Sequence, residues 1–74
     1  MFEEMLNKRV REFLVRTQRG QFSNNIILGK KSDYYVEYFQ ERLYWVYNYG
    51  TEQITMIFAS SPKDAVEEYE KWID

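Results

Sequence analysis

The pattern of apolar and polar residues changes twice along the chain. From Phe2 to Thr17 apolar residues recur every three or four positions, which is the spacing of one face of an α-helix. Gly20 supplies a C-terminal stop for this helix. Between residues 21 and 59 the spacing becomes strand-like, and from Pro62 to about Ile73 it is helical again. The pattern therefore predicts a helix at each end and a sheet between them.

Four strand-like runs, joined by short connections, make up the middle of the chain. They cover residues 21–28, 34–40, 43–49 and 53–59. Connections of this length favour antiparallel neighbours over crossovers. We expect residues 1–74 to form a single small α+β domain, a four-stranded antiparallel β-meander with one N-terminal and one C-terminal helix in the order α-β-β-β-β-α.

The start of the second helix has a capping sequence. Ser61 is a suitable N-cap, Pro62 suits the first helical position, and Asp64 stands three residues after the cap. We expect helix two to begin at Pro62.

Two turns set the expected strand register. A two-residue turn at Gly50-Thr51 pairs Tyr49 with Glu52, Tyr47 with Ile54, Trp45 with Met56, and Leu43 with Phe58. Continuing this register through a turn at Glu41-Arg42 pairs Tyr38 with Trp45, Val36 with Tyr47, and Tyr34 with Tyr49. We expect the face that carries these pairs to be the helix-covered core.

Aromatic residues occupy both faces of this predicted sheet. Half of the sixteen residues from Tyr34 to Tyr49 are aromatic. If both helices pack on one face, the opposite face is an exposed apolar patch that binds a partner protein or a second copy of the chain. If each face has its own helix, the same residues are ordinary core. The sequence leaves both arrangements open. The candidate partner-binding residues are Tyr35, Phe39, Tyr44, Val46 and Ile57.

Charge divides the chain into two unequal parts. Residues 1–31 hold seven basic and three acidic residues, a balance of +4, whereas residues 32–74 hold three basic and nine acidic residues, a balance of −6. The asymmetry either steers a charged partner or is neutralised within the fold or across a dimer. The candidate anion-binding residues are Arg9, Arg11, Arg19, Lys30 and Lys31.

The alternative function is binding of single-stranded nucleic acid. Sheet aromatics can stack on unpaired bases when basic residues nearby hold the phosphates. Around the aromatic strands, however, only Arg42 is basic, and the acidic residues oppose a phosphate backbone: Asp33, Glu37, Glu41 and Glu52.

Catalysis is disfavoured by composition. The chain has no His and no Cys, which removes the commonest general base, nucleophile and metal ligands together. Its three glycines are isolated, so no phosphate-binding loop is present. We expect no catalytic residue, no metal site and no cofactor.

Two partial resemblances accompany this reading. The element order is similar to that of a double-stranded-RNA-binding domain with an extra strand, but that family has a Lys-rich start to its last helix, whereas this helix opens Pro62-Lys63-Asp64-Ala65 and becomes acidic. Residues 43–73 resemble the strand-strand-helix of arm-type DNA-binding domains in phage integrases. The matching residues are Trp45-Val46-Tyr47, Phe58-Ala59-Ser60, Asp64-Ala65 and Trp72. Those domains place basic and polar residues in the groove, where this chain has aromatic and acidic ones, so neither resemblance implies a nucleic-acid contact.

The expected function is that of a non-enzymatic protein-interaction module. It would act through the aromatic sheet face or through an acidic surface that includes Glu67, Glu68 and Glu70, as a small regulator or inhibitor does.

A composition rich in Tyr, Glu, Ile, Asn and Lys with only two Ala suggests a bacterial or phage source. The absence of Cys and of a secretory pattern favours a cytoplasmic location, and the charges between Met1 and Thr17 exclude a membrane span there.

Overall fold

The computed structural model describes residues 2–19 and 23–73. Its elements are α1 (Phe2–Arg19), the 3-10 helix η1 (Ser23–Asn25), β1 (Ile26–Leu28), β2 (Asp33–Gln40), β3 (Leu43–Asn48), β4 (Gln53–Phe58) and α2 (Pro62–Trp72). The four strands form one antiparallel sheet in the order β1-β2-β3-β4. This confirms the predicted α+β architecture and its element order, α-β-β-β-β-α.

The first strand is shorter than predicted. Of the run 21–28, only Ile26–Leu28 is a strand, whereas Ser23–Asn25 forms a short 3-10 helix and residues 21–22 lie outside the described part. The residue types of this segment, Ser and Asn, favour turns over strand ladders. Helix α1 continues to Arg19, and the stop predicted at Gly20 lies outside the described residues.

The predicted start of the second helix is confirmed. Ser61 is the N-cap, with extended backbone (φ −156°, ψ 163°), and Pro62 opens the helix. The amide of Asp64 donates to Ser61 Oγ at 3.2 Å, which satisfies one of the amides that the first helical turn leaves without a partner.

The β3–β4 hairpin has the predicted register. Trp45 pairs with Met56, Tyr47 with Ile54, and Leu43 with Phe58. The ladder ends at the pair of Asn48 and Gln53, so the outermost pair expected, Tyr49 with Glu52, lies within the turn. There the amide of Glu52, at φ 60°, donates to the carbonyl of Asn48 at 2.7 Å.

The predicted β2–β3 register is wrong by one residue. The turn at Glu41-Arg42 does form, with left-handed φ values of 35° and 64°, and it joins Gln40 to Leu43. However, the ladder skips Phe39, so that Tyr38 pairs with Tyr44 instead of Trp45. A β-bulge places two residues of one strand opposite one of its partner, and a one-residue slip exchanges the faces of every side chain beyond it.

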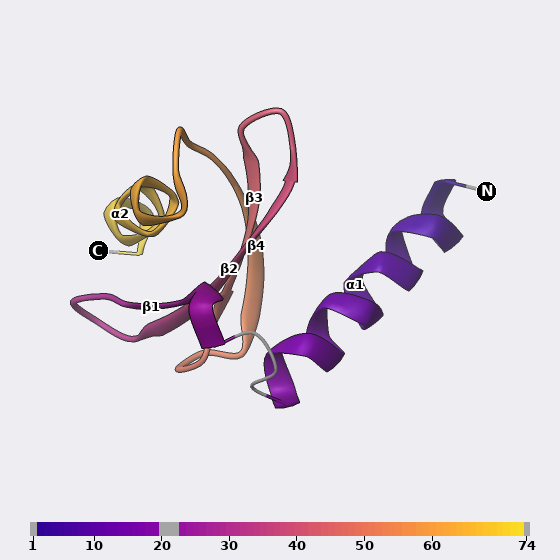
Figure 1. Ribbon diagram of the computed structural model, residues 1–74, viewed down its shortest axis with the longest axis horizontal. Coiled ribbons are helices and arrows are strands. Elements are labelled where there is room, and N and C mark those ends of the chain that lie inside the picture. The colour runs from indigo at the N-terminus through magenta and orange to yellow at the C-terminus, as the bar shows by residue number, and fades with distance from the viewer. Residues whose placement is uncertain (1, 20–22, 74) are drawn as a thin grey trace.

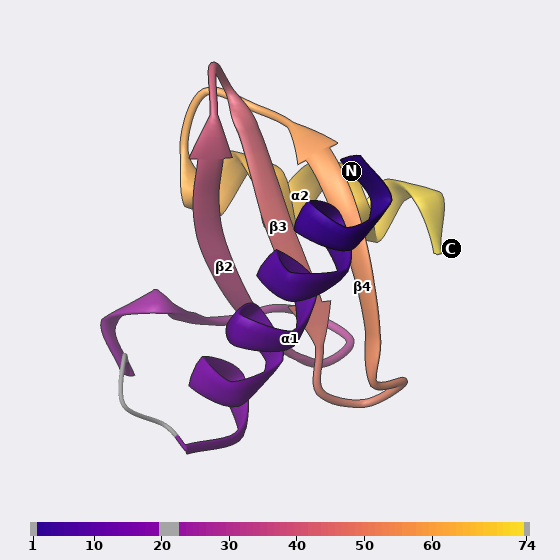
Figure 2. The same cartoon turned by 90° about the vertical axis from the view of Figure 1, so that its right-hand side faces the viewer.

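The helices lie on opposite faces of the sheet. Figure 1 shows the strands edge-on between α2 and α1, and Figure 2 shows α1 in front of the strands with α2 behind them. Of the two arrangements that the sequence leaves open, the structure has one helix on each face.

Large aromatic side chains join α1 to its face of the sheet. Phe13, which is 1% exposed, packs edge-on against Tyr35 and stacked against Trp45, with both ring centroids 5.4 Å away. Tyr47 completes the buried cluster. At the end of α1, the hydroxyl of Tyr49 donates to the carbonyl of Thr17 at 3.0 Å and so ties the last helical turn to the sheet.

Helix α2 covers its face of the sheet with two small residues and one tyrosine. Ala65, Val66 and Tyr69 from the helix contact Tyr34, Val36, Tyr44, Val46 and Ile57 from the strands. Within this cluster Tyr34 and Tyr69 meet edge-on at 5.5 Å, and the amide of Asn48 donates to the hydroxyl of Tyr69 at 3.3 Å. Each sheet face therefore has its own core.

We predict that truncating Phe13 releases α1 from the sheet. Phe13→Ala removes a buried ring that contacts two aromatic partners, so the free energy of unfolding should fall by about 3–5 kcal/mol. Urea unfolding measures the loss, and hydrogen exchange of the α1 amides reports release of the helix. The control is Val15→Ala, two residues away on the same helix and 46% exposed, which should change stability by less than about 0.5 kcal/mol. Equal losses in the two variants would contradict the described packing of α1.

Candidate protein-interaction site

The patch expected on an open sheet face is buried in the structure. Tyr35 and Phe39 lie under α1, whereas Tyr44, Val46 and Ile57 lie under α2. Four of these residues are no more than 8% exposed, and Phe39 is half-buried against Trp45. The expectation that the set forms an exposed surface is wrong, because each helix covers one face and because the bulge at Phe39 redistributes the side chains between faces.

The candidate anion-binding residues are divided between the two sides of the sheet. Arg9 on α1 lies over the ring of Phe39, 5.1 Å from its centroid, and Arg11 is exposed on the same helix. Lys30 and Lys31 belong to the β1–β2 turn beside α2, on the other side. The side chain of Arg19 lies outside the described part of the chain. The described members of the set therefore do not form one basic surface.

Contacts between the basic and acidic parts of the chain neutralise some of the charge within the fold. Arg16 on α1 forms a two-bond ion pair with Glu37 on β2, with its Nε 2.9 Å from Oε2, and the hydroxyl of Tyr35 donates to the same oxygen at 3.1 Å. The hydrogen bond to Glu37 raises the pKa of Arg16. Burial, followed by the charge of Glu37, raises the pKa of Tyr35 from 10.0 to about 12.

Glu70 on α2 holds the β1–β2 turn. Its Oε2 accepts hydrogen bonds from the backbone amides of Lys30 and Lys31, at 2.8 and 3.1 Å, and from the hydroxyl of Tyr34 at 3.1 Å. Burial, followed by this hydrogen bond, raises the pKa of Tyr34 from 10.0 to about 12. One member of the proposed acidic surface is thus occupied inside the fold. A second, Glu68, lies 3.3 Å from the ammonium of Lys71.

The open edge of β4 offers unpaired backbone groups. The amide of Ala59 donates to the carbonyl of Arg42 at 2.8 Å, which makes these two residues a hydrogen-bonded pair at the end of the β3–β4 ladder. Hydrogen-bonded and non-hydrogen-bonded pairs alternate along an antiparallel ladder. The amides and carbonyls of Ile54, Met56 and Phe58 therefore point away from β3, toward an edge that no described strand covers.

Exposed apolar side chains gather on both sides of this edge. Five of the eight exposed large apolar residues in the described chain lie there, and we call them the β4 edge surface: Met5, Met56, Phe58, Trp72 and Ile73. Phe58 and Trp72 are the most exposed of them, at 73% and 78%. Such a concentration is uncommon on a small monomer and is typical of an interaction site.

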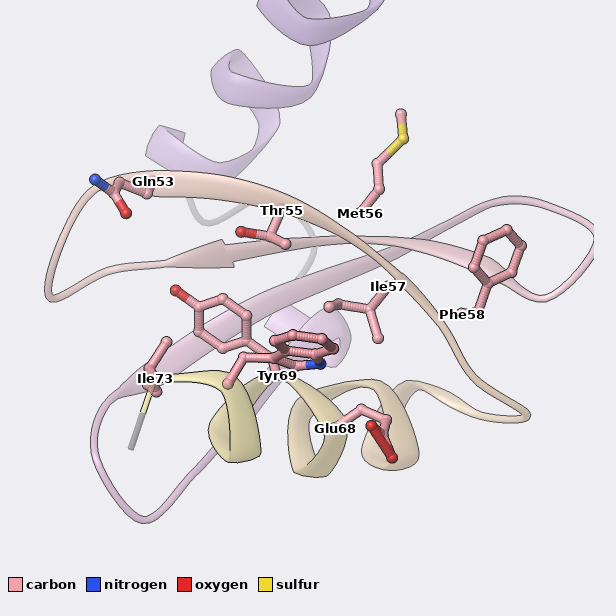
Figure 3. A pocket seen from close by; sticks show the side chains of 9 residues that line it. Gln53, Thr55, Met56, Ile57, Phe58, Glu68, Tyr69 and Ile73 are labelled. Carbon is pink, nitrogen blue, oxygen red and sulfur yellow. The ribbon is translucent and has the colours of Figure 1, made fainter.

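A groove of about 540 Å³ lies between β4 and the C-terminal end of α2. Figure 3 shows Ile57 pointing into this space toward Tyr69, with Ile73 at one end of the groove and Phe58 near the other. Met56 points to the opposite side of β4, where it lines a second groove with Met5 and Leu6 of α1. Both sides of the open edge can thus contact an added strand.

The opposite edge of the sheet is protected. β1 has three residues, and the turn that follows it contains Lys30 and Lys31. Short edge strands and nearby lysines are common devices against unwanted strand pairing. β4 has six residues, and the whole stretch 53–62 carries no charge. The sheet therefore presents one edge suited to pairing and one that resists it.

The sequence contains a signal for this site that the alternation of side chains between sheet faces does not reveal. The sequence predicts Met56 and Phe58 in the helix-covered core, and it places Trp72 and Ile73 at the end of helix two. A final meander strand is always a sheet edge, and here that strand is uncharged and apolar. These residues are recognised as a candidate binding site because they lie at the edge of the sheet, not because they share one of its faces.

Comparisons with protein-family models, with curated proteins and with solved structures found no match to this chain. Among the described residues, no group of three or more acidic side chains is placed to hold a metal ion. No helix in the described ranges is long and apolar enough to cross a membrane.

Alkaline pH is predicted to destabilise the fold through Tyr34 and Tyr35. Their pKa values are raised from 10.0 to about 12, so the folded protein keeps two protons that the unfolded chain loses above pH 10. The stabilisation is complete below pH 10 and is lost as the pH rises toward 12. Urea unfolding across this range should show the fall, and a Tyr34→Phe, Tyr35→Phe double variant should show a flatter one. An equally steep fall in the double variant would contradict this assignment.

Proposed function

We propose that the protein is a non-enzymatic protein-interaction module that binds by strand addition at the β4 edge. The observation that carries the proposal is the open edge itself, where the backbone groups of Ile54, Met56 and Phe58 point outward between two apolar grooves. In strand addition, backbone hydrogen bonds supply affinity, and pockets for alternate side chains supply specificity.

The residues of β4 suit this role. Met56 points to the α1 side, and the exposed Trp72 and Ile73 line the groove on the α2 side, so an added strand meets apolar groups on both of its faces. The strand carries no charge that would repel an approaching backbone. Natural sheets protect long apolar edges, so an unprotected one indicates use. A module of this kind acts by occupying its partner's surface, which is how a small regulator or inhibitor works.

Binding of single-stranded nucleic acid receives less support. Stacking on bases needs neighbouring exposed rings, whereas Tyr35, Tyr44 and Trp45 are each no more than 8% exposed. The exposed sheet aromatics, Tyr38 and Phe58, lie on β2 and β4 with β3 between them. The candidate basic residues lie on both sides of the sheet rather than beside one aromatic surface.

We predict that extended peptides bind at β4 and that a charge at its end blocks them. Random peptides are selected on sparsely immobilised protein, where alternating apolar sequences should be enriched. Phe58→Asp should weaken their binding at least tenfold, which corresponds to about 1.4 kcal/mol. Bound peptides should slow hydrogen exchange of the amides of Ile54, Met56 and Phe58.

The matched control is Leu28→Asp. Leu28 is also the last residue of an edge strand and is 77% exposed, against 73% for Phe58. This variant should bind the selected peptides as the parent chain does. Equal binding by the two aspartate variants and the parent, or protection of amides elsewhere, would refute strand addition at β4.

A further inference from the structure

We propose that the strand added at β4 is the β4 strand of a second copy of this chain. The two strands would run antiparallel about a two-fold axis and join two four-stranded sheets into one of eight strands. This inference rests on the proposed function, since it names the partner for the same edge.

The outward-facing backbone groups define the register of such a pair. Ile54, Met56 and Phe58 alternate with residues that bond to β3, so only these three can bond across the axis. Centring the axis on Met56 places Met56 opposite its own copy and Ile54 opposite Phe58 of the second copy. All three residues then take part. Centring it on Thr55 would place Phe58 opposite Glu52, which lies in the turn at φ 60°.

Charge along the edge is compatible with self-association. In a two-fold interface the same edge of both copies is brought together, so an edge that carries charges of one sign repels its own copy. The stretch 53–62 carries no charge, and the Met56-centred register places Glu52 opposite Ser60 of the second copy. No like charges therefore face each other along the paired strands.

Apolar groups on both sides of the joined sheet would be covered by this pairing. On the α1 side Met56 meets its copy, and Met5 lies in the adjoining groove. On the α2 side the C-terminal end of α2 extends past β4, as Figure 2 shows, so Trp72 and Ile73 are placed to contact the strand of the second copy.

The exposed apolar area comes close to what a small specific dimer interface buries. Phe58 and Trp72 are 73% and 78% exposed, and since a large aromatic side chain carries about 150–250 Å², the two offer on the order of 300 Å² per copy. With Met5, Met56 and Ile73 the pair of copies would bury roughly 900 Å², near the 1,000 Å² or so that specific interfaces need.

Cysteine cross-linking tests both the dimer and its register, because the chain has no cysteine of its own. Cα atoms of a hydrogen-bonded antiparallel pair lie about 5.5 Å apart, within the range that a disulfide spans. Under mild oxidation Met56→Cys should therefore form a covalent dimer. The control is Phe58→Cys, whose two copies would be four residues apart, or about 13 Å, and should not cross-link.

Mass measurement completes the test. Light scattering should give the parent chain the mass of two copies, and Met56→Lys, which sets two ammonium groups against each other at the axis, should be monomeric with unchanged circular dichroism. Leu28→Lys, on the protected edge, should remain dimeric. Should Met56→Lys not fold, the cross-linking pair still decides the matter.

The results distinguish failure of the dimer from failure of strand addition. A monomeric parent chain that still binds the selected peptides at β4 would overturn the dimer and leave strand addition standing. A dimer that persists in folded Met56→Lys, or that cross-links equally through Phe58→Cys, would place the contact elsewhere and overturn the register. A monomer that binds no extended peptide would overturn both.

Discussion

A sheet with large aromatic side chains on both faces needs a cover on each side, and this constraint organises the molecule. Phe13 of α1 covers Tyr35 and Trp45, while Tyr69 of α2 covers Tyr34 on the reverse side. With one helix on each face, no helix or strand among the described residues covers the open edge of β4. The exposed apolar residues therefore collect along β4, the last strand, rather than on a face.

Much of the fold could be predicted from local sequence. Ser61 and Pro62 define a helix start through their own backbone chemistry, and the short β3–β4 turn that contains Gly50 joins two strands whose register the sequence predicts. The bulge at Phe39 is different. The bulge places Tyr38 on the α2 side of the sheet and Phe39 on the α1 side, where the Phe39 ring packs edge-on against Trp45. What surrounds each ring depends on the helix that covers its side.

The same distinction explains why the candidate site was misplaced. Parity along a strand predicts two faces but does not say which is covered, because the cover comes from helices remote in sequence. The basic N-terminal part likewise gave no sign that Arg16 would meet Glu37 or that Glu70 would hold the turn at Lys30. These pairs are separated by 21 and 40 positions along the chain, and only the folded topology brings them together.

The two tryptophans report on different parts of the molecule. Trp45 is 5% exposed at the centre of the sheet, whereas Trp72 is 78% exposed at the end of α2, beside the open edge. Indole fluorescence is sensitive to contact with water, so the emission of the native chain combines an interior signal with one from the edge. The sequence thus carries an intrinsic optical probe that distinguishes an occupied edge from an unfolded core without any added dye.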